Sequence, residues 1–494
     1  MRRKLPIFYS ALLLTGVNLL LRFVSTSFQV YVSGRIGAAG VGLLQLVLSV
    51  GAMSLTLGMA GIRTASMYLC AGELGRRHPE NITRILSACV LYSLLCSGTV
   101  AAGLYWAAPK LADVWIGDAQ TTAALRVYAA FLPVTCLTGV MTGYFTAASR
   151  IGTLAAVEIA EQLFSMLFTM AVLIFWAGQD AAKACLGIVL GNGVSMCLTL
   201  TCLVILRIRE QAKIGDRIPI RNRLLETAVP LALADDLKAG ISTTENLMVP
   251  RRLALYRGVA DPLAAFGIVC GMVFPILMFP AAILYALAEL LIPELARCAA
   301  AASKQRITYL VQQSLRVAIF YGCLFGGLEF LLAESLCLRL YSEPEAGYYL
   351  RLYAFLIPML YCDAITDAMI KGLGQQKASV QYNILTSAMD VVGLFLLLPR
   401  YGMTGYFISF LISHIVNFLL SIRRLIKTVG NVIPLRVPFF SLLGAAIALF
   451  PATRVASPAA GCLVYVLVFG SLLTLFQVFG KQDLKWLCGL ITKK

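Results

Sequence analysis

Arg126-Val-Tyr-Ala-Ala-Phe-Leu-Pro133 and Arg351-Leu-Tyr-Ala-Phe-Leu-Ile-Pro358 are two versions of one motif, 225 positions apart in the chain. The same offset relates Gly42 to Gly267 and aligns the apolar segments of the first half with those of the second. A constant offset across six apolar segments indicates a duplication. Each copy holds an even number of segments, so both copies would cross a membrane in the same orientation. We therefore expect an axis along the membrane normal and a cavity between the copies.

The composition places these segments in a membrane. Of the 494 residues, 60% are apolar and 13% are charged, and the mean hydropathy is +0.84. Soluble domains are about half apolar and about a quarter charged, and a soluble fold of this composition would expose large apolar patches. Intrinsic disorder, a secreted disulfide scaffold and a cytosolic enzyme are excluded. An outer-membrane barrel is disfavoured because its strands alternate in polarity.

The fold class we predict is an all-α polytopic membrane protein with about 14 transmembrane helices. The predicted spans are 5–32, 38–62, 82–106, 122–148, 157–177, 183–206, 224–249, 262–292, 306–333, 347–371, 379–398, 402–426, 436–453 and 459–480. We expect a six-helix lobe at 1–222, a second at 223–430, and two additional helices with a cytoplasmic tail at 431–494.

The distribution of basic residues predicts the topology. The chain has 41 Lys and Arg residues and a net charge of +17. With the N-terminus in the cytoplasm, 27 of these 41 fall on inner segments, 10 on outer segments and 4 within spans. This bias follows the positive-inside rule and predicts that both termini are cytoplasmic. The basic run at 207–223 is the strongest inner anchor, and we interpret it as contacting lipid headgroups and not nucleic acid.

No motif indicates catalysis or a metal site. The 14 cysteines lie mostly inside apolar runs, without a Cys-x-x-Cys pair, so we interpret them as small packing residues. Phosphate-binding loops and zinc-protease and serine-hydrolase motifs are absent from the sequence. A membrane glycosyltransferase or polymerase would need a substantial extracytoplasmic loop, and no loop is that long. We expect no enzyme, no catalytic residue and no cofactor.

The seventh span carries charges on one helical face. Asp235, Lys238, Ser242 and Glu245 are spaced i, i+3, i+7 and i+10, with Asp236 beside them. A charge at the centre of a bilayer costs about 3 kcal/mol, so this stripe must face protein or water. It is either a self-satisfying Asp235–Lys238 pair or the wall of a water-filled substrate path.

Similar polar stripes occur in other spans. In the first span the stripe is Asn18, Arg22, Ser25 and Gln29, and in the fifth it is Glu158, Gln162 and Ser165. The offset of 225 carries the polar faces of spans four and five onto acidic residues, which are Asp363, Asp367 and Asp390. If the two halves form two walls around one cavity, both should carry polar faces at equivalent positions, as observed in the sequence.

Four short stretches resemble a known family. Ser33-Gly-Arg-Ile-Gly37-Ala-Ala-Gly40-Val-Gly42-Leu-Leu-Gln45, Gly143-Tyr-Phe145, Glu161-Gln162 and Val249-Pro-Arg-Arg-Leu253 are similar to segments of the stage V sporulation protein B family. That family is part of the multidrug/oligosaccharidyl-lipid/polysaccharide (MOP) exporter superfamily. Ala39 stands where the family commonly has an acid, and Ala147 where a glycine is usual.

The resemblance implies a two-lobed, alternating-access transporter in the bacterial cytoplasmic membrane. It would flip an undecaprenyl-pyrophosphate-linked glycan precursor outward for cell-wall or spore-cortex synthesis. We expect it to work as a monomer alongside cell-wall synthesis enzymes, with Na⁺, H⁺ or the membrane potential as the driving force. The alternative is a cation-coupled multidrug or metabolite antiporter of the MATE type, which the acid-rich seventh span favours.

Both hypotheses assign roles to the polar stripes. A pyrophosphate group requires cationic partners such as arginine, and sugar hydroxyls require hydrogen-bonding side chains. The candidate substrate-binding residues are Arg22, Asn18, Gln29, Glu158, Lys238, Asn246, Arg251 and Arg252. The acids that could bind a coupling ion, or a cationic drug, are Asp235, Asp236, Glu245, Asp363, Asp367 and Asp390.

The topology is testable with thiol chemistry. A cysteine placed within 207–223 should resist a membrane-impermeant maleimide added to intact cells and react after permeabilisation, because the positive-inside rule puts this segment in the cytoplasm. Labelling of intact cells at the same rate would contradict the predicted orientation.

Overall fold

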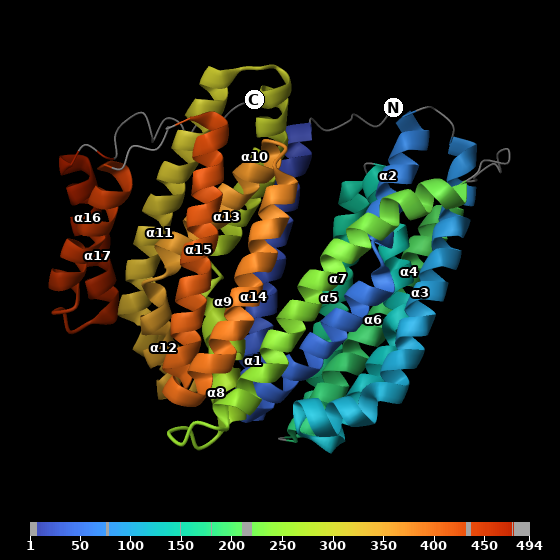
Figure 1. Cartoon of the computed structure of the whole chain (residues 1–494). Coiled ribbons are helices and arrows are strands. Elements are labelled where there is room, and N and C mark those ends of the chain that lie inside the picture. Colours follow the sequence, from blue (N-terminus) through green and yellow to red (C-terminus); the bar gives the residue numbers. More distant parts are fainter. Residues whose placement is uncertain are drawn as a thin grey trace. The chain divides into compact units, whose positions relative to one another are not determined.

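The structure is a computed structural model that describes residues 7–75, 79–148, 150–178, 180–209, 220–430, 436–476 and 478 (Figure 1). All regular elements in these ranges are helices, which confirms the predicted all-α class. Contacts divide the chain into two compact units, Met1–Gly267 and Ile268–Lys494. The contact boundary lies after α7, whereas the predicted lobe boundary at 222/223 follows the sequence repeat and stays a prediction.

The first unit begins with the longest helix of the chain. Its elements are α1 (Ile7–Met59), α2 (Ile62–Gly75), η1 (Pro79–Asn81), α3 (Ile82–Lys110), η2 (Leu111–Ile116), η3 (Ala119–Thr121), α4 (Thr122–Ala147), α5 (Ile151–Val172), η4 (Leu173–Ala177), α6 (Ala181–Ile208), α7 (Ile220–Leu253) and α8 (Pro262–Phe266). The π-helical η5 (Gly267–Val273) continues α8 across the boundary.

The second unit contains the remaining helices. They are α9 (Phe274–Leu277), α10 (Ala281–Ala300), α11 (Lys304–Tyr341), α12 (Pro344–Ala354), α13 (Ile357–Gly372), α14 (Gln376–Tyr401), α15 (Met403–Val429), α16 (Arg436–Ala452) and α17 (Pro458–Leu475).

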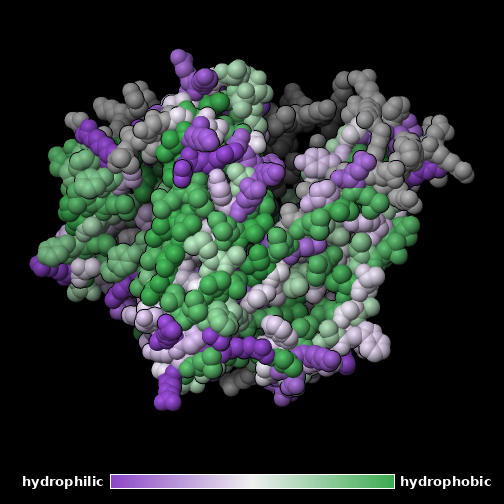
Figure 2. Space-filling view, in the orientation of Figure 1, coloured by the Kyte–Doolittle hydropathy of each residue, from purple (hydrophilic) through white to green (hydrophobic). Residues whose placement is uncertain are grey.

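The described helices account for the predicted spans. Nine are long and apolar enough to cross a membrane, and two bent pairs, α8–α9 with α10 and α12 with α13, raise the number to 11. Three predicted spans remain. One arises because α1, counted once above, consists of two parts that meet at Gly37 with φ 70°, and the others are the charged helix α7 and α16, with 17 residues. The chain is therefore a multi-pass membrane protein, and Figure 2 shows extensive apolar surface over its helices.

Aspartates start three elements of the first unit. Asp180 accepts hydrogen bonds from the amides of Ala182 and Lys183 at 3.0 and 3.2 Å, directly before α6. These bonds to the charged carboxylate lower the pKa of Asp180. Asp118 and Asp261 cap η3 and α8 in the same way. The caps satisfy amides that the first helical turn leaves without partners, so each element begins at a defined residue.

Two repeat-related glycines mark the closest crossing in the first unit. A Cβ on Gly42 would lie 2.2 Å from the carbonyl oxygen of Leu263, and a Cβ on Gly267 would lie 2.1 Å from that of Ala38. Ala38 and Leu263 are themselves 225 positions apart, as Gly42 and Gly267 are. Residues related by the repeat thus contact each other reciprocally, which is the pattern of a two-fold interface. This contact supports the predicted duplication.

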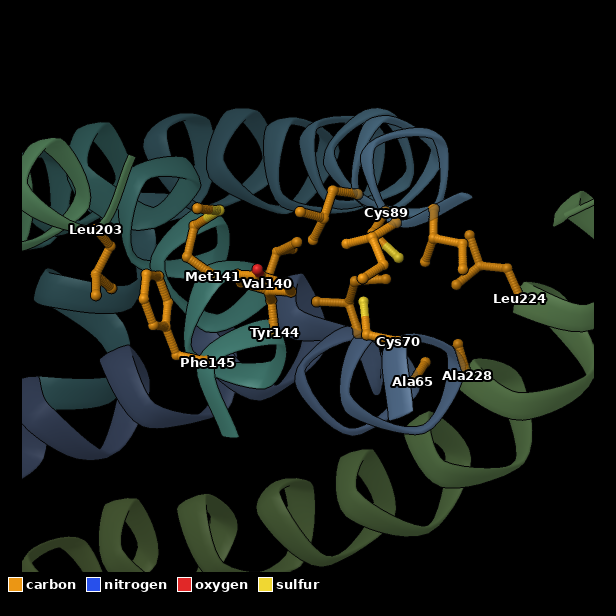
Figure 3. Close-up of a cluster of buried hydrophobic side chains, with 14 of the residues drawn as sticks. Ala65, Cys70, Cys89, Val140, Met141, Tyr144, Phe145, Leu203, Leu224 and Ala228 are labelled. Atoms are coloured by element: carbon orange, nitrogen blue, oxygen red, sulfur yellow. The ribbon is translucent and has the colours of Figure 1, made fainter. Parts of the chain in front are cut away.

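A buried cluster joins α2, α3, α4, α6 and α7 within the first unit. Figure 3 shows Cys70 and Cys89 from α2 and α3 in one cluster with Val140 and Met141 of α4. Both cysteines are free and buried, which agrees with their predicted packing role. Gly143 lets α4 approach α2 so closely that a Cβ there would lie 2.4 Å from a backbone oxygen. Gly139 and Gly143 are spaced as Gly-x-x-x-Gly, a pattern that lets membrane helices pack closely.

The duplicated motif folds differently in its two copies. Pro133 lies inside the continuous helix α4, whereas Pro358 follows a break that bends α12 against α13 by 58°. The same proline position therefore lies within a helix in one copy and beside a helix break in the other. At the break, Gly322 of α11 approaches so closely that a Cβ would lie 2.6 Å from the Cα of Pro358. The equivalent position on α3 is Ser97, which has a side chain.

The glycine crossing makes a testable prediction. Gly42→Ala should lower the apparent melting temperature in detergent, because overpacking against a backbone carbonyl costs about 1–3 kcal/mol. Gly34→Ala is the matched control on α1, since nothing lies within 4 Å of its Cβ position. An unchanged melting temperature for Gly42→Ala would contradict the close crossing.

Candidate functional site

A cavity of about 210 Å³ lies between α1, α5 and α6 of the first unit. We call it the α1–α5–α6 cavity. Its polar lining residues are Ser25, Gln29, Ser33, Gln45, Gln162, Ser165, Thr169 and Asn192. The other lining residues are apolar, so none of the side chains in its wall is charged. The cavity presents hydroxyl groups and carboxamides, which donate and accept hydrogen bonds without a net charge.

Helical spacing on α1 builds one wall of this cavity. Ser25, Gln29 and Ser33 recur at intervals of four residues, so they share one face. Ser33 Oγ donates to the carbonyl of Gln29 at 2.8 Å. Arg22 lies on this same face, about one turn before Ser25, and is exposed. Arg22 itself does not line the cavity.

The wall formed by α5 and α6 is fixed by contacts between their side chains. Ser165 Oγ lies 2.6 Å from Asn192 Oδ1, and Thr199 Oγ1 donates to Glu161 Oε2 at 3.2 Å. Gly191 lets the helices approach, because a Cβ there would lie 2.7 Å from Thr169 Oγ1. These contacts hold Asn192 and its neighbours against α5, which sets the width of the cavity.

A second cavity, of about 280 Å³, lies between α1 and α7. We call it the α1–α7 cavity. Asn246 Nδ2 donates to Ser49 Oγ at 2.9 Å, and Thr243 Oγ1 donates to the Ser49 carbonyl at 3.1 Å. Gln45 and Leu48 line both cavities. The two cavities therefore share a wall, in which Gln45 is the polar side chain.

The predicted substrate-binding residues are only partly brought together. Gln29 and Asn246 line the two cavities, whereas Arg22 is exposed on α1 and lines neither. Glu158 is half-buried on α5, one turn before Gln162, and does not line either cavity. The side chain of Asn18 lies outside the part of the chain that the structure describes.

The charged residues of the α7 stripe are exposed or half-buried and do not line the cavities. Asp235 and Lys238 are exposed, and Asp236 and Glu245 are half-buried. Within the described part of the chain, Asp236 Oδ1 is buried and has no hydrogen-bond partner. The stripe contributes only its uncharged member, Ser242, to the α1–α7 cavity.

The two arginines at the end of α7 lie apart from these cavities. The guanidinium of Arg251 lies over the ring of Trp115, 5.2 Å from its centroid, and Arg252 is half-buried beside it. A cation over an indole face is stabilised by the ring quadrupole, so Arg251 has a structural partner on η2.

The acids predicted in the second unit all have partners. Asn417 Nδ2 donates to both oxygens of Asp363 at 3.2 and 2.9 Å, and His414 Nδ1 lies 3.9 Å from the same carboxylate. Asp367 pairs with Lys371 at 2.6 Å and accepts a hydrogen bond from Ser379.

Asp390 accepts a hydrogen bond from the Ser409 hydroxyl. The three acids therefore lie on α13 and α14, in contact with partners on α13, α14 and α15. Their predicted role in binding a coupling ion stays a prediction.

The second unit also holds an apolar cavity of about 840 Å³ between α11, α12–α13, α15 and α16. Leu315, Phe418 and Leu442 are typical of its lining, and Arg316 and Gln312 are its polar members. Arg316 Nη2 donates to the carbonyl of Val478 at 2.7 Å, next to the end of α17. This intramembrane arginine therefore binds a backbone carbonyl that follows the helix terminus.

The predicted site residues did not include Gln45, Gln162 or Asn192. Gln45 stands in the stretch that carries the family resemblance, and Gln162 lies on the stripe of the fifth span. Asn192 is flanked by Gly191 and Gly193. An uncharged amide among glycines is a weak signal in one sequence, because the helix that it faces is not known.

The chain is similar to known proteins in sequence. Residues 14–175 match the MatE family. Stage V sporulation protein B of Bacillus subtilis (strain 168) is 22% identical over 443 residues, which cover 86% of this chain and 84% of that protein. Sporulation protein YkvU of the same organism is 24% identical over 269 residues, covering 51% of this chain and 58% of that protein.

Solved structures with the same fold include transporters. The lipid II flippase MurJ, in an inward closed conformation, gives a TM-score of 0.70 at 12% identity and covers 94% of this chain and 98% of its own. An inward-facing multidrug resistance MATE family transporter gives 0.67 at 14% identity, with 90% and 100% covered. The predicted resemblance is confirmed: the chain is similar in sequence to stage V sporulation protein B and has the fold of MOP superfamily transporters.

Proposed function

We propose that this protein flips a lipid-linked oligosaccharide or peptidoglycan precursor outward across the bacterial cytoplasmic membrane. The fold supports this proposal, because its structural neighbours include a lipid II flippase. Alternating access is the mechanism we infer, since MATE transporters of this fold are known in inward-facing and outward-facing conformations. A transport role of this kind requires no catalytic residue.

The neutral lining of the α1–α5–α6 cavity is the observation that carries the proposal. A glycan presents hydroxyl and amide groups, and each must find a hydrogen-bond partner when it leaves water. Gln29 and Gln45 on α1 and Asn192 on α6 offer such partners. An organic cation would instead require a carboxylate, and the cavity wall contains none. The lining therefore favours a sugar over a cationic drug.

Arg22 supplies the charge that the neutral cavity lacks. A guanidinium can make two parallel hydrogen bonds to a phosphate group. Arg22 shares a helical face with Ser25 and Gln29, so a pyrophosphate at Arg22 would direct its sugar into the cavity. Lys238, Arg251 and Arg252 are secondary candidates for the same group.

A hydrocarbon chain needs a different environment. The apolar cavity of the second unit, about 840 Å³, could receive a segment of a polyprenyl chain without burying unpaired polar groups. Its presence supports a substrate that has both a glycan and a lipid part.

We propose the following setting for transport. Both termini lie in the cytoplasm, the chain acts as a monomer, and cell-wall synthesis enzymes supply its substrate. Na⁺, H⁺ or the membrane potential drives the cycle, without a cofactor.

A cation-coupled multidrug antiporter is the second candidate. The match of residues 14–175 to MatE favours it, and so do the acids of α7, among which Asp236 has a buried oxygen without a partner in the described chain. Such an acid could bind a cationic substrate or a coupling ion.

Reconstitution separates the two candidates. Proteoliposomes that contain the full-length protein and a fluorescent lipid-linked disaccharide should lose fluorescence to an impermeant quencher faster than empty liposomes do. Ion-dependent efflux of an organic cation, with no stimulation of the lipid-linked disaccharide, would reject flipping and support the antiporter.

Arg22 is the first residue to test. Hydrogen bonds to charged groups contribute about 1.5–3 kcal/mol, so Arg22→Ala should slow translocation by about 10- to 150-fold. Arg35→Ala is the matched control, because Arg35 is also exposed on α1 but lies over the ring of Tyr31. Equal rates for the two variants would remove Arg22 from the site.

Substitution of Gln45 tests whether the cavity binds the glycan. Gln45→Leu keeps the side-chain volume but removes the carboxamide shared by both cavities. One neutral hydrogen bond contributes about 0.5–1.5 kcal/mol, so the substrate concentration for half-maximal flipping should rise about 2- to 12-fold. Gln120→Leu, at an exposed position of η3, should leave it unchanged. An unaltered value for Gln45→Leu would place the glycan elsewhere.

A further inference from the structure

Glu329 is a buried acid on α11 that lines none of the three cavities described above. Its side chain is 6% exposed. Neither carboxyl oxygen has a hydrogen-bond partner among the residues that the structure describes. An ionised carboxylate in such a position would lack both water and a counter-charge, which strongly disfavours the charged form.

The groups around Glu329 are already engaged elsewhere. The phenols of Tyr361 on α13 and Tyr321 on α11 are its electrostatic neighbours. Tyr361 donates its hydroxyl hydrogen to the Leu277 carbonyl at 3.1 Å, and Tyr321 donates to the Pro280 carbonyl at 2.8 Å. Neither phenol therefore donates to the carboxyl group.

Other titratable groups on α11 and on two helices packed against it, α12 and α17, are uncharged or have partners of their own. The buried thiol of Cys337 lies on α11 and carries no charge in its usual form. On α12, Arg351 pairs with Glu334 at 2.8 Å. On α17, Tyr465 donates to the Cys323 carbonyl at 2.7 Å.

Glu329 stands beside the break between α12 and α13. Gly322, Gly326 and Glu329 are spaced i, i+4 and i+7, so they share one face of α11. Gly322 abuts Pro358, and a Cβ on Gly326 would lie 3.0 Å from the carbonyl oxygen of Ala354. The face that ends in Glu329 therefore packs against the 58° bend.

The sequence repeat provides an internal comparison. The position equivalent to Glu329 on α3 is Leu104, which is buried at 5% exposure. In that copy the proline motif lies in the continuous helix α4. The acid and the helix break thus occur together in one copy and are both absent from the other.

We propose that Glu329 is a proton-binding site whose occupancy is coupled to the bend between α12 and α13. The proposal deepens the proposed transport function by naming the proton as the coupling ion. The Glu329 carboxylate takes up a proton from water and is buried as a neutral acid in the bent form. When α12 and α13 rearrange and the site opens, the proton returns to water. Proton binding therefore shifts the population between two conformations, because only the neutral carboxyl fits the closed site.

The other acids of this unit are poorer candidates. Asp363 and Asp390 accept hydrogen bonds from Asn417 and Ser409, and Asp367 pairs with a lysine. Each of these carboxylates therefore has a polar partner within the second unit. Glu329 has no comparable hydrogen-bond donor in the described chain. A proton that binds its carboxylate therefore displaces no other partner.

Infrared difference spectroscopy tests the site without any transport assay. Full-length protein in lipid membranes should show the carbonyl stretch of a protonated carboxylic acid at neutral pH. Glu329→Gln should remove this band, whereas Glu334→Gln, at an exposed carboxylate on the same helix, should retain it. Absence of the band in the unsubstituted protein, or its persistence in Glu329→Gln, would overturn the proposal.

Transport then tests the coupling. One coupled proton changes a rate by up to about tenfold per pH unit, so flipping by the unsubstituted protein should depend on pH. Glu329→Gln and Glu329→Leu should abolish this dependence, and the leucine variant reproduces the residue that the first copy tolerates. Retained pH dependence in both folded variants would contradict coupling at Glu329. If the lipid-linked substrate is not moved but the carboxyl band is present, the proposed substrate fails and the proton site stands.

Discussion

A polar side chain within a membrane-spanning helix needs a partner inside the protein, because hydrocarbon offers no hydrogen bonds. This constraint organises both units. Asn417 holds Asp363, Ser165 contacts Asn192, and Arg316 donates to the Val478 carbonyl. Polar groups are consequently gathered on the faces where helices meet. A cavity with a polar lining contains polar groups that lack hydrogen-bond partners on the cavity side. A bound substrate can supply those partners.

Tight packing between helices determines where such cavities can form. Gly42 and Gly267 let backbone carbonyls approach at a reciprocal crossing, and Gly143 and Gly322 act in the same way at other contacts. Around the α1–α5–α6 cavity, by contrast, α1 presents Ser25, Gln29 and Gln45 instead of glycine. Space and hydrogen-bonding capacity thus coincide, which is what recognition of a sugar requires.

Much of this arrangement could be predicted from the sequence. Apolar length and the 225-residue offset located the membrane-spanning elements, because a span must be about 20 apolar residues long. The break at Pro358 and the continuous helix around Pro133 could not be told apart from the motif itself, because neighbours that differ between the copies, such as Gly322 and Ser97, lie on other helices.

The candidate site was harder to predict for the same reason. A stripe on one helix says which residues share a face, but not which face opens into a cavity. The charged residues of α7 were predicted as site residues because placing a charge in a membrane costs free energy. The cavities are instead lined by uncharged side chains such as Gln45, Gln162 and Asn192. Glu329 could have been noticed by comparing it with Leu104 at the repeat offset. That its carboxyl has no hydrogen-bond partner within the described ranges is visible only in three dimensions.

A structure with a bound lipid-linked disaccharide tests the central claim most directly. We expect sugar density between α1, α5 and α6, with the pyrophosphate within hydrogen-bond distance of Arg22 and the carboxamide of Gln45 on the glycan. Sugar density that avoids this cavity and lies against the acids of α7, with no phosphate at Arg22, would contradict the account.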